Sequence, residues 1–190
     1  MKSLAAVGLA AAATLLSGCY RGGSKPVDMS QLAHGSNWLT IRGVPQLEQD
    51  GEHECGATAL AMLLGYWNMP TRPEEIRAAS GQPSQQGISA GFLRTYLRGR
   101  GMEAHLLPGT MADLERELQG GRPVLVGIQK KLSTGNYAHY QLVVGINRDE
   151  GELAVIDPAD GLREYSFHDF AREWAPANAL MLVAAPAASP

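Results

Sequence analysis

The stretch that decides the fold runs from Gln49 to Trp67 and reads QDGEHECGATALAMLLGYW. After a polar start, the residues from Cys55 onward are apolar on nearly every side, which is typical of a helix buried on all faces. The sequence therefore predicts a central helix over residues 55–67 that begins at the cysteine and follows a polar loop.

Cys55 occupies the first position of this predicted helix. Unpaired backbone N–H groups and the helix dipole favour negative charge at a helix N-terminus, so a thiolate is stabilised there. The thiolate is the form of cysteine that acts as a nucleophile. A free cysteine is also commonly a buried core residue, and its position alone leaves both interpretations open.

His139 and Asp157 are the groups that can complete a catalytic site with Cys55. His139 opens the predicted strand HYQLVVG, and Asp157 ends the next one, LAVID. Taken singly, His139 reads as a surface residue and Asp157 as a turn residue before a proline. A hairpin that joins the two strands places both side chains within hydrogen-bond reach. Together with Cys55 they form a nucleophile, a general base and a carboxylate that orients the base.

Gln49 stands six residues before Cys55 and can donate its side-chain N–H to a developing oxyanion. The loss of one such donor typically costs on the order of 3 kcal/mol of transition-state stabilisation. Gln46 competes for this role, but it follows Pro45 on an extended segment and is the poorer candidate.

Zinc binding is a weaker interpretation of the histidines. A site built from His53, Cys55 and His139 would lack the four ligands of a structural zinc, and the chain has no CxxC or HxxxH spacing. His105 and His168 lie in polar surroundings and are expected at the surface. We therefore expect no metal and no other cofactor.

The rest of the chain places helices first and strands afterwards. An extended segment is expected over 39–47, and further helices over 71–79, with Thr71 and Glu74 as a capping box, 88–97, 110–120 and 167–174. Predicted strands cover 124–128, 140–146, 153–156, 162–165 and 180–183. This order indicates an α+β fold, with an N-terminal helical lobe and a C-terminal antiparallel sheet that carries His139 and Asp157.

The first 18 residues have the layout of a secretory signal, with Lys2, an apolar run and small residues before Cys19. The apolar run is shorter than the roughly 20 residues that span a bilayer as a helix. The segment from Cys19 to residue 37 contains Gly, Ser and Pro without an apolar period, so it is expected to be a flexible tether.

The remaining residues are enough for one domain, expected over 38–184, with a frayed end at 185–190. The chain carries a formal net charge of −3 and only two cysteines. No basic patch stands out, so nucleic-acid binding lacks its usual electrostatic signature. We expect a monomer.

The segment from Gln49 to Leu63, QDGEHECGATALAML, resembles the active-site segment of the C39 family of papain-like cysteine peptidases. His139-Tyr140 before Val-Val-Gly, and Ile156-Asp157-Pro158 before Gly161, are similar to that family's later motifs. The similarity covers about residues 44–165. It implies a papain-like fold with Gln49 at the oxyanion, Cys55 as nucleophile, His139 as base and Asp157 as its partner.

Leu16-Ser17-Gly18-Cys19 resembles a lipobox, which implies that Cys19 becomes the lipidated N-terminus of a bacterial lipoprotein. Tyr20 follows, in place of the Asp that retains lipoproteins in the inner membrane, so the resemblance implies the periplasmic face of the outer membrane. The alternative is an ordinary secreted protein in which Cys19 has no special role.

These features predict a thiol-dependent peptidase that cleaves a protein or peptide in the exported compartment through an acyl-enzyme on Cys55. Family members in bacteriocin transporters cut leader peptides after Gly-Gly in the cytoplasm, whereas this chain carries a predicted export signal. The resemblance therefore leaves the substrate open, with a Gly-Gly-like site among the candidates. Two alternatives stay open: an acyltransferase or amidase with the same triad, and a non-catalytic peptide-binding domain. The presence of Cys55 argues against the second.

Overall fold

The computed structural model describes residues 22–34, 37–132 and 135–187. Its helices are α1 (Met29–His34), α2 (Cys55–Tyr66), α3 (Pro73–Ser80), α4 (Ala90–Gly99), α5 (Met111–Gln119), α6 (Phe167–Trp174) and the 3-10 helix η1 (Ala175–Ala177). Its strands are β1 (Lys25–Pro26), β2 (Trp38–Thr40), β3 (Met102–Pro108), β4 (Val124–Leu132), β5 (Gly135–Asn147), β6 (Glu152–Asp157), β7 (Gly161–Ser166) and β8 (Leu180–Pro186).

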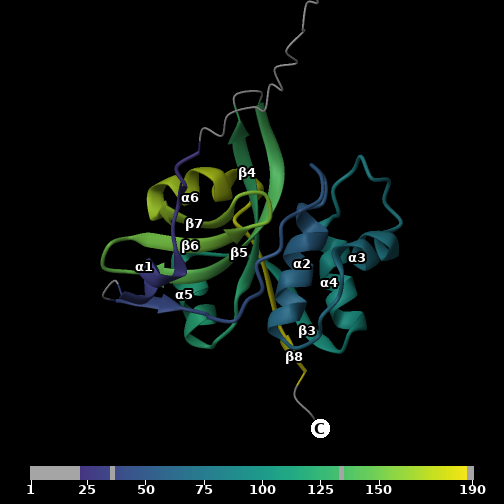
Figure 1. Ribbon diagram of the computed structural model, residues 1–190, viewed down its shortest axis with the longest axis horizontal. Helices are drawn as coiled ribbons and strands as arrows, with labels where there is room; N and C mark the ends of the chain where they lie inside the picture. The colour runs from purple at the N-terminus through teal and green to yellow at the C-terminus, as the bar shows by residue number, and fades with distance from the viewer. Residues whose placement is uncertain (1–21, 35–36, 133–134, 188–190) are drawn as a thin grey trace, which may run out of the picture.

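The described strands form one antiparallel sheet in the order β1-β7-β6-β5-β4-β8-β3, and β2 pairs with β5 beside this path. Helices α2, α3 and α4 gather on one side of the long β4–β5 hairpin, and α5 and α6 lie on the other (Figure 1). The predicted α+β fold, with a helical part before an antiparallel sheet, is confirmed.

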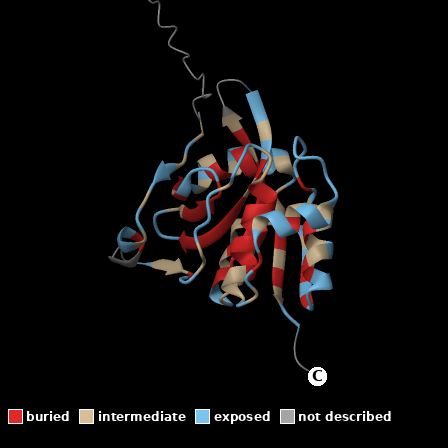
Figure 2. Cartoon of the chain, turned by 45° about the vertical axis from the view of Figure 1, so that its right-hand side comes forward, coloured by how far each residue is buried: buried red, intermediate tan, exposed pale blue. Residues whose placement is uncertain are grey.

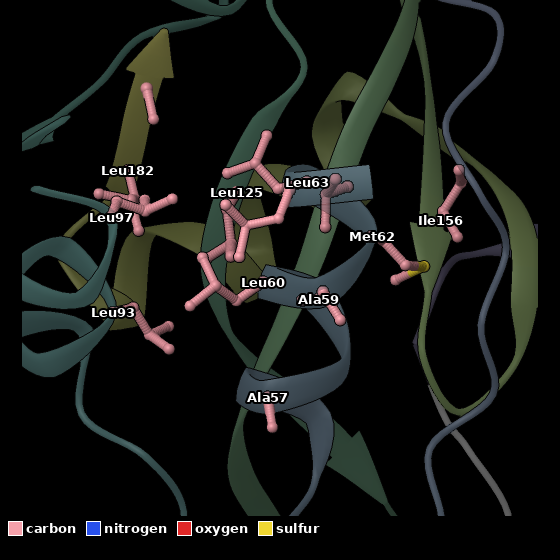
Figure 3. Close-up of a cluster of buried hydrophobic side chains, with 14 of the residues drawn as sticks. Ala57, Ala59, Leu60, Met62, Leu63, Leu93, Leu97, Leu125, Ile156 and Leu182 are labelled. Atoms are coloured by element: carbon pink, nitrogen blue, oxygen red, sulfur yellow. The ribbon is translucent and has the colours of Figure 1, made fainter. Parts of the chain in front are cut away.

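Helix α2 is the centre of the larger core. Every residue from Cys55 to Leu64 is buried, as its apolar sequence predicts. Figure 3 shows side chains of α2, including Leu60 and Leu63, beside Leu93 and Leu97 of α4 and Leu125 of β4. Burial of one such leucine contributes roughly 1.5–3 kcal/mol, so these contacts hold the start of α2 in place.

A second core lies on the other face of the sheet, under α5 and α6. Tyr165, Phe170 and Trp174 stack within it, with ring centroids 5.6 and 5.2 Å apart. Figure 2 shows that the strands between the two cores are mostly buried. The sheet is thus a rigid support for residues on its strands.

The capping box predicted at Thr71 and the helix start predicted at Thr110 have different outcomes. At the start of α5, Thr110 and Asp113 form the reciprocal pair of hydrogen bonds. At the start of α3 the prediction is wrong, because Pro73 takes the first helical position and Arg72 becomes the N-cap. The hydroxyl of Thr71 donates to the carbonyl of Met69 instead.

The sheet extends further than the sequence indicates. Strand β3 was not predicted, and it pairs along its whole length with β8 at the sheet edge. Strands β4 and β5 also continue beyond their predicted ends into a long hairpin. The expectation of a frayed end from residue 185 is wrong for its first part, because β8 pairs through Pro186.

The segment expected to be a tether packs onto the domain where it is described. Strand β1 pairs with β7, and Lys25 forms a 2.7 Å ion pair with Glu164. Leu32 of α1 is only 2% exposed and belongs to the larger core. The prediction of a flexible tether over residues 19–37 is therefore wrong for residues 24–32. This segment has no apolar period, but its strand pairing with β7 and the burial of Leu32 hold it on the domain.

The signal segment and Cys19 lie outside the described residues. Among the described helices, none has both the length and the apolar character that a bilayer crossing requires.

Candidate active site

Cys55 is the first residue of α2 and is 4% exposed. The N-cap residue Glu54 makes no side-chain hydrogen bond to the helix, so no side chain competes for the N–H groups of this first turn. These groups favour negative charge at the helix start.

His139 and Asp157 lie on the neighbouring strands β5 and β6, and their side chains meet as predicted. Nε2 of His139 lies 2.7 Å from Oδ1 of Asp157, and each residue is 1% exposed. The other ring nitrogen, Nδ1, is buried without a hydrogen bond of good geometry, and Cys55 is close enough to pair with it. The structure thus brings thiol, imidazole and carboxylate together in that order.

The environment of His139 favours the imidazolium. Burial lowers the pKa of His139, but its hydrogen bonds and charge interactions with Asp157 and Cys55 outweigh this and raise the pKa to about 9. The histidine is therefore protonated near neutral pH when the thiol is ionised, which is the charge state of a thiolate–imidazolium pair.

Asp157 is held by more donors than the sequence indicates. Its Oδ1 also accepts from the backbone N–H of Ala159 at 2.8 Å, and its Oδ2 accepts from Nζ of Lys130 at 2.8 Å and Nε2 of Gln141 at 2.7 Å. Burial raises the pKa of Asp157, but His139 and Lys130 bring it well below its usual range. The carboxylate is therefore ionised and fixed in orientation.

The hydrogen bonds continue away from the site through Gln141. Its Nε2 lies 3.2 Å from the hydroxyl of Tyr165, which donates to Glu173 of α6 at 3.0 Å. Sequence reasoning missed Lys130, Gln141 and this extension. The alternation of side chains along a strand could have indicated these residues. Lys130 points to the same face of its strand as Ile128, and Gln141 points to the same face as His139.

Gln49 lies in the loop before α2, and its side chain is turned toward its own loop. Its Nε2 donates to the carbonyl of Gly51 at 2.6 Å, and its Oε1 is buried without a partner. The second amide hydrogen remains for another acceptor. Gln46, the poorer candidate, is exposed.

Two tyrosines of β5 pack around the site. The ring of Tyr137 meets the imidazole of His139 edge to face, with centroids 5.6 Å apart. The ring of Tyr140 lies over the start of α2, where a Cβ on Gly56 would come within 3.3 Å of it. A side chain at position 56 would therefore make a tight contact between α2 and β5.

The other histidines do not join the site. His53 is partly exposed, and its carbonyl accepts a hydrogen bond from Arg77. His105 and His168 are exposed, as predicted. Within residues 22–34, 37–132 and 135–187, no three His, Cys, Asp or Glu side chains are grouped so that they could hold a metal ion.

Comparison with known proteins identifies the family. Residues 44–189 match the model of the peptidase C39 family. The chain belongs to the peptidase C39 family. The enzyme class predicted from the sequence, that of a cysteine peptidase, is therefore confirmed at the level of the family.

One curated relative of this C39 chain is the lactococcin-G-processing and transport ATP-binding protein of Lactococcus lactis, 27% identical over 126 residues. The match covers 66% of the chain but only 17% of that relative, so the chain spans about a sixth of its length.

Solved structures share the fold. A double glycine motif protease from an AMS/PCAT transporter, in complex with its leader peptide, has a TM-score of 0.63 and 24% identity, covering 77% of this chain and 94% of the other. The peptidase domain of Streptococcus ComA also has a TM-score of 0.63, with 21% identity over 76% of this chain and 99% of the other. The predicted papain-like C39 fold is thereby confirmed.

Proposed function

We propose that this C39 domain hydrolyses a peptide bond in an exported protein or peptide through a thioester on Cys55. The observation that carries this proposal is the buried 2.7 Å contact between His139 and Asp157 beside the thiol at the start of α2. These groups provide a nucleophile, an acid–base residue and an orienting carboxylate.

In the acylation step, the thiolate of Cys55 attacks the carbonyl carbon of the scissile bond and forms a C–S bond. The imidazolium of His139 then donates its Nδ1 proton to the leaving nitrogen as the C–N bond breaks. The amine departs, and the acyl group stays on sulfur. Asp157 holds the ring through Nε2, so Nδ1 faces the reacting atoms.

In the deacylation step, neutral His139 accepts a proton from a water molecule that attacks the thioester carbon. The C–S bond breaks, the carboxylic acid product leaves, and the thiolate–imidazolium pair is restored. The backbone N–H of Cys55 and the side-chain amide of Gln49 stabilise the oxyanion in both steps. This role requires the amide of Gln49 to turn from Gly51 toward the substrate.

The substrate class follows from the export signal and from the relatives. The similar protease from an AMS/PCAT transporter is a double glycine motif protease, and its structure contains a leader peptide. We infer that the present domain also accepts an extended peptide, with a Gly-Gly-like site as the first sequence to test. Lipidation of Cys19 and a place at the periplasmic face of the outer membrane complete the proposal.

The experiment compares new N-termini in the exported proteome of cells that carry the wild-type chain or Cys55→Ala. Termini that depend on Cys55 identify substrates, and synthetic peptides across those sites are then cleaved with the purified chain. His53→Ala serves as the matched control, because His53 lies two residues from Cys55 but outside the triad. Equal cleavage by Cys55→Ala and the wild-type chain would contradict the proposal.

Product analysis in ¹⁸O-labelled water separates hydrolysis from acyl transfer and from binding alone. A hydrolase places ¹⁸O in the new carboxyl group, whereas an acyltransferase joins the acyl group to an amine without the label. A domain that only binds peptides gives neither product.

A further inference from the structure

Lys130 is a buried lysine that contacts the carboxylate of the proposed triad. It lies on β4, is 2% exposed, and places Nζ 2.8 Å from Oδ2 of Asp157. The same Nζ also bonds Asp160, in the turn after β6. A lysine is almost never buried to this degree without paired charges, because removing an ammonium from water is costly.

The carboxylate of Asp157 lies between two cations. His139 contacts Oδ1 at 2.7 Å, and Lys130 contacts Oδ2 at 2.8 Å. One negative charge therefore stabilises both the imidazolium and the ammonium. The two cations also repel each other at short range in a dry environment, where charge interactions are much stronger than in water.

Ionisable groups face His139 and Lys130 from every neighbouring element. On the thiol side is Cys55 of α2, and along β5 is Tyr137, whose pKa burial raises to about 12, so it is neutral. Beyond Gln141 lie Tyr165 of β7 and Glu173 of α6. Among these groups, Lys130 is the permanent cation in contact with the carboxylate of the triad.

We propose that Lys130 is a positioning residue of the triad. It fixes Oδ2 of Asp157. Because Lys130 and His139 share the negative charge of this carboxylate, Lys130 also sets the upper pH limit of the thiolate–imidazolium pair. The inference rests on the proposed function of the same site. Without the ammonium, Asp157 acts on the imidazolium alone, so His139 stays protonated to a higher pH. A lysine that only supports the fold would change stability and leave this limit unmoved.

The test is a pH titration of the His139 ring by NMR, in the full chain labelled with ¹³C-histidine. The resonance is assigned by its loss in His139→Gln. We expect Lys130→Met to raise the titration midpoint by about one pH unit, from the charge removed at this distance. Lys130→Arg keeps the positive charge, so its midpoint should lie closer to the wild-type value than that of Lys130→Met.

Lys131→Met is the matched control, because Lys131 is the next residue on β4 and is partly exposed. It should leave the midpoint unchanged. Asp160→Asn provides a second, opposite test, since the Asp160 side chain is 37% exposed and its replacement by an amide of the same shape disturbs little packing. It removes an anion from Lys130, frees the ammonium to act on Asp157, and should lower the midpoint of His139.

An unchanged midpoint in Lys130→Met would overturn the proposal. If Lys130→Met does not fold, an unchanged midpoint in Asp160→Asn would overturn it. The titration needs no peptide substrate, so it is independent of cleavage. If the variants show these shifts but the wild-type chain cleaves no peptide, the result would count against the proposed function and leave the role of Lys130 intact.

Discussion

The backbone N–H of Gln49 donates to the carbonyl oxygen of Pro158 over 2.9 Å. This bond joins the loop that precedes the nucleophile to the turn that directly follows Asp157. The candidate oxyanion residue and the triad carboxylate are therefore tied together through the backbone, although they are far apart in the sequence. Substitutions of either side chain should leave this link in place and report on chemistry.

Asp157→Asn should lower kcat/KM for a cleaved peptide by roughly 10²–10⁴-fold, because the ring of His139 loses the carboxylate that orients it. The change also leaves Lys130 beside a neutral amide, so a lower thermal unfolding temperature is expected. Steady-state kinetics and calorimetry measure the two effects. A fully active Asp157→Asn chain would contradict the role given to the carboxylate.

Gln49→Ala should lower kcat by on the order of 10²–10³-fold with little change in thermal stability. Its side chain donates only to the nearby carbonyl of Gly51, so the fold loses little. Gln46→Ala, in the same loop and exposed, is the control and should behave as the wild-type chain. Equal activity of the two variants would remove Gln49 from the oxyanion site.

The stability of the wild-type chain should fall as the pH rises from about 6.5 to 9. The pKa of His139 is raised to about 9 in the folded chain, so its stabilising contribution is complete below the unfolded value near 6.5 and is lost as the pH passes 9. The loss is on the order of a few kcal/mol. Chemical denaturation at several pH values measures it, and His139→Gln should show a flatter dependence across this window.

Gly56→Ala should destabilise the chain by roughly 1–3 kcal/mol, because the new methyl group would lie 3.3 Å from the ring of Tyr140 and 3.4 Å from Ile88. The ring of Tyr140 or the start of α2 must give by a few tenths of an ångström, so activity should fall with stability. Gly87→Ala is the control, since a Cβ there meets nothing within 4 Å. Similar unfolding temperatures for both variants would show that α2 and β5 are less tightly apposed.

Leu32→Ala should cost roughly 2–4 kcal/mol of unfolding free energy, because the side chain is buried in the larger core. Ser30→Ala, on the same helix and exposed, should have little effect. Denaturant titration compares the two. If residues 24–32 were a tether in solution, both variants would match the wild-type chain.

The elements that the sequence predicts well are those with strong local patterns. The apolar run after Cys55 gives α2, and α6 matches its predicted bounds of residues 167–174. His139 and Asp157 were predicted to meet because one begins a strand and the other ends the next, so an antiparallel hairpin brings them to the same edge. The pairing of Leu142 with Ile156 in the structure agrees with this arrangement.

The missed features depend on contacts between distant segments. Met102, Glu103, Ala104 and His105 alternate between buried and exposed, but the strand exists because it pairs with β8. Lys130 and Lys131 lie beyond the predicted strand end at residue 128, and lysines are mostly exposed. Only the carboxylates of Asp157 and Asp160, from another hairpin, explain why Lys130 is buried.

The packing of β1 against β7 has a consequence for where this peptidase could work. Ser24 is already fixed to Arg163. If Cys19 carries the proposed lipid, only residues 20–23 separate the acyl chains from the folded body, a span of at most about 17 Å. Such an enzyme would stay close to its bilayer and meet polypeptides that emerge from that surface or lie along it. Proteins farther away in the surrounding compartment would not reach its active site.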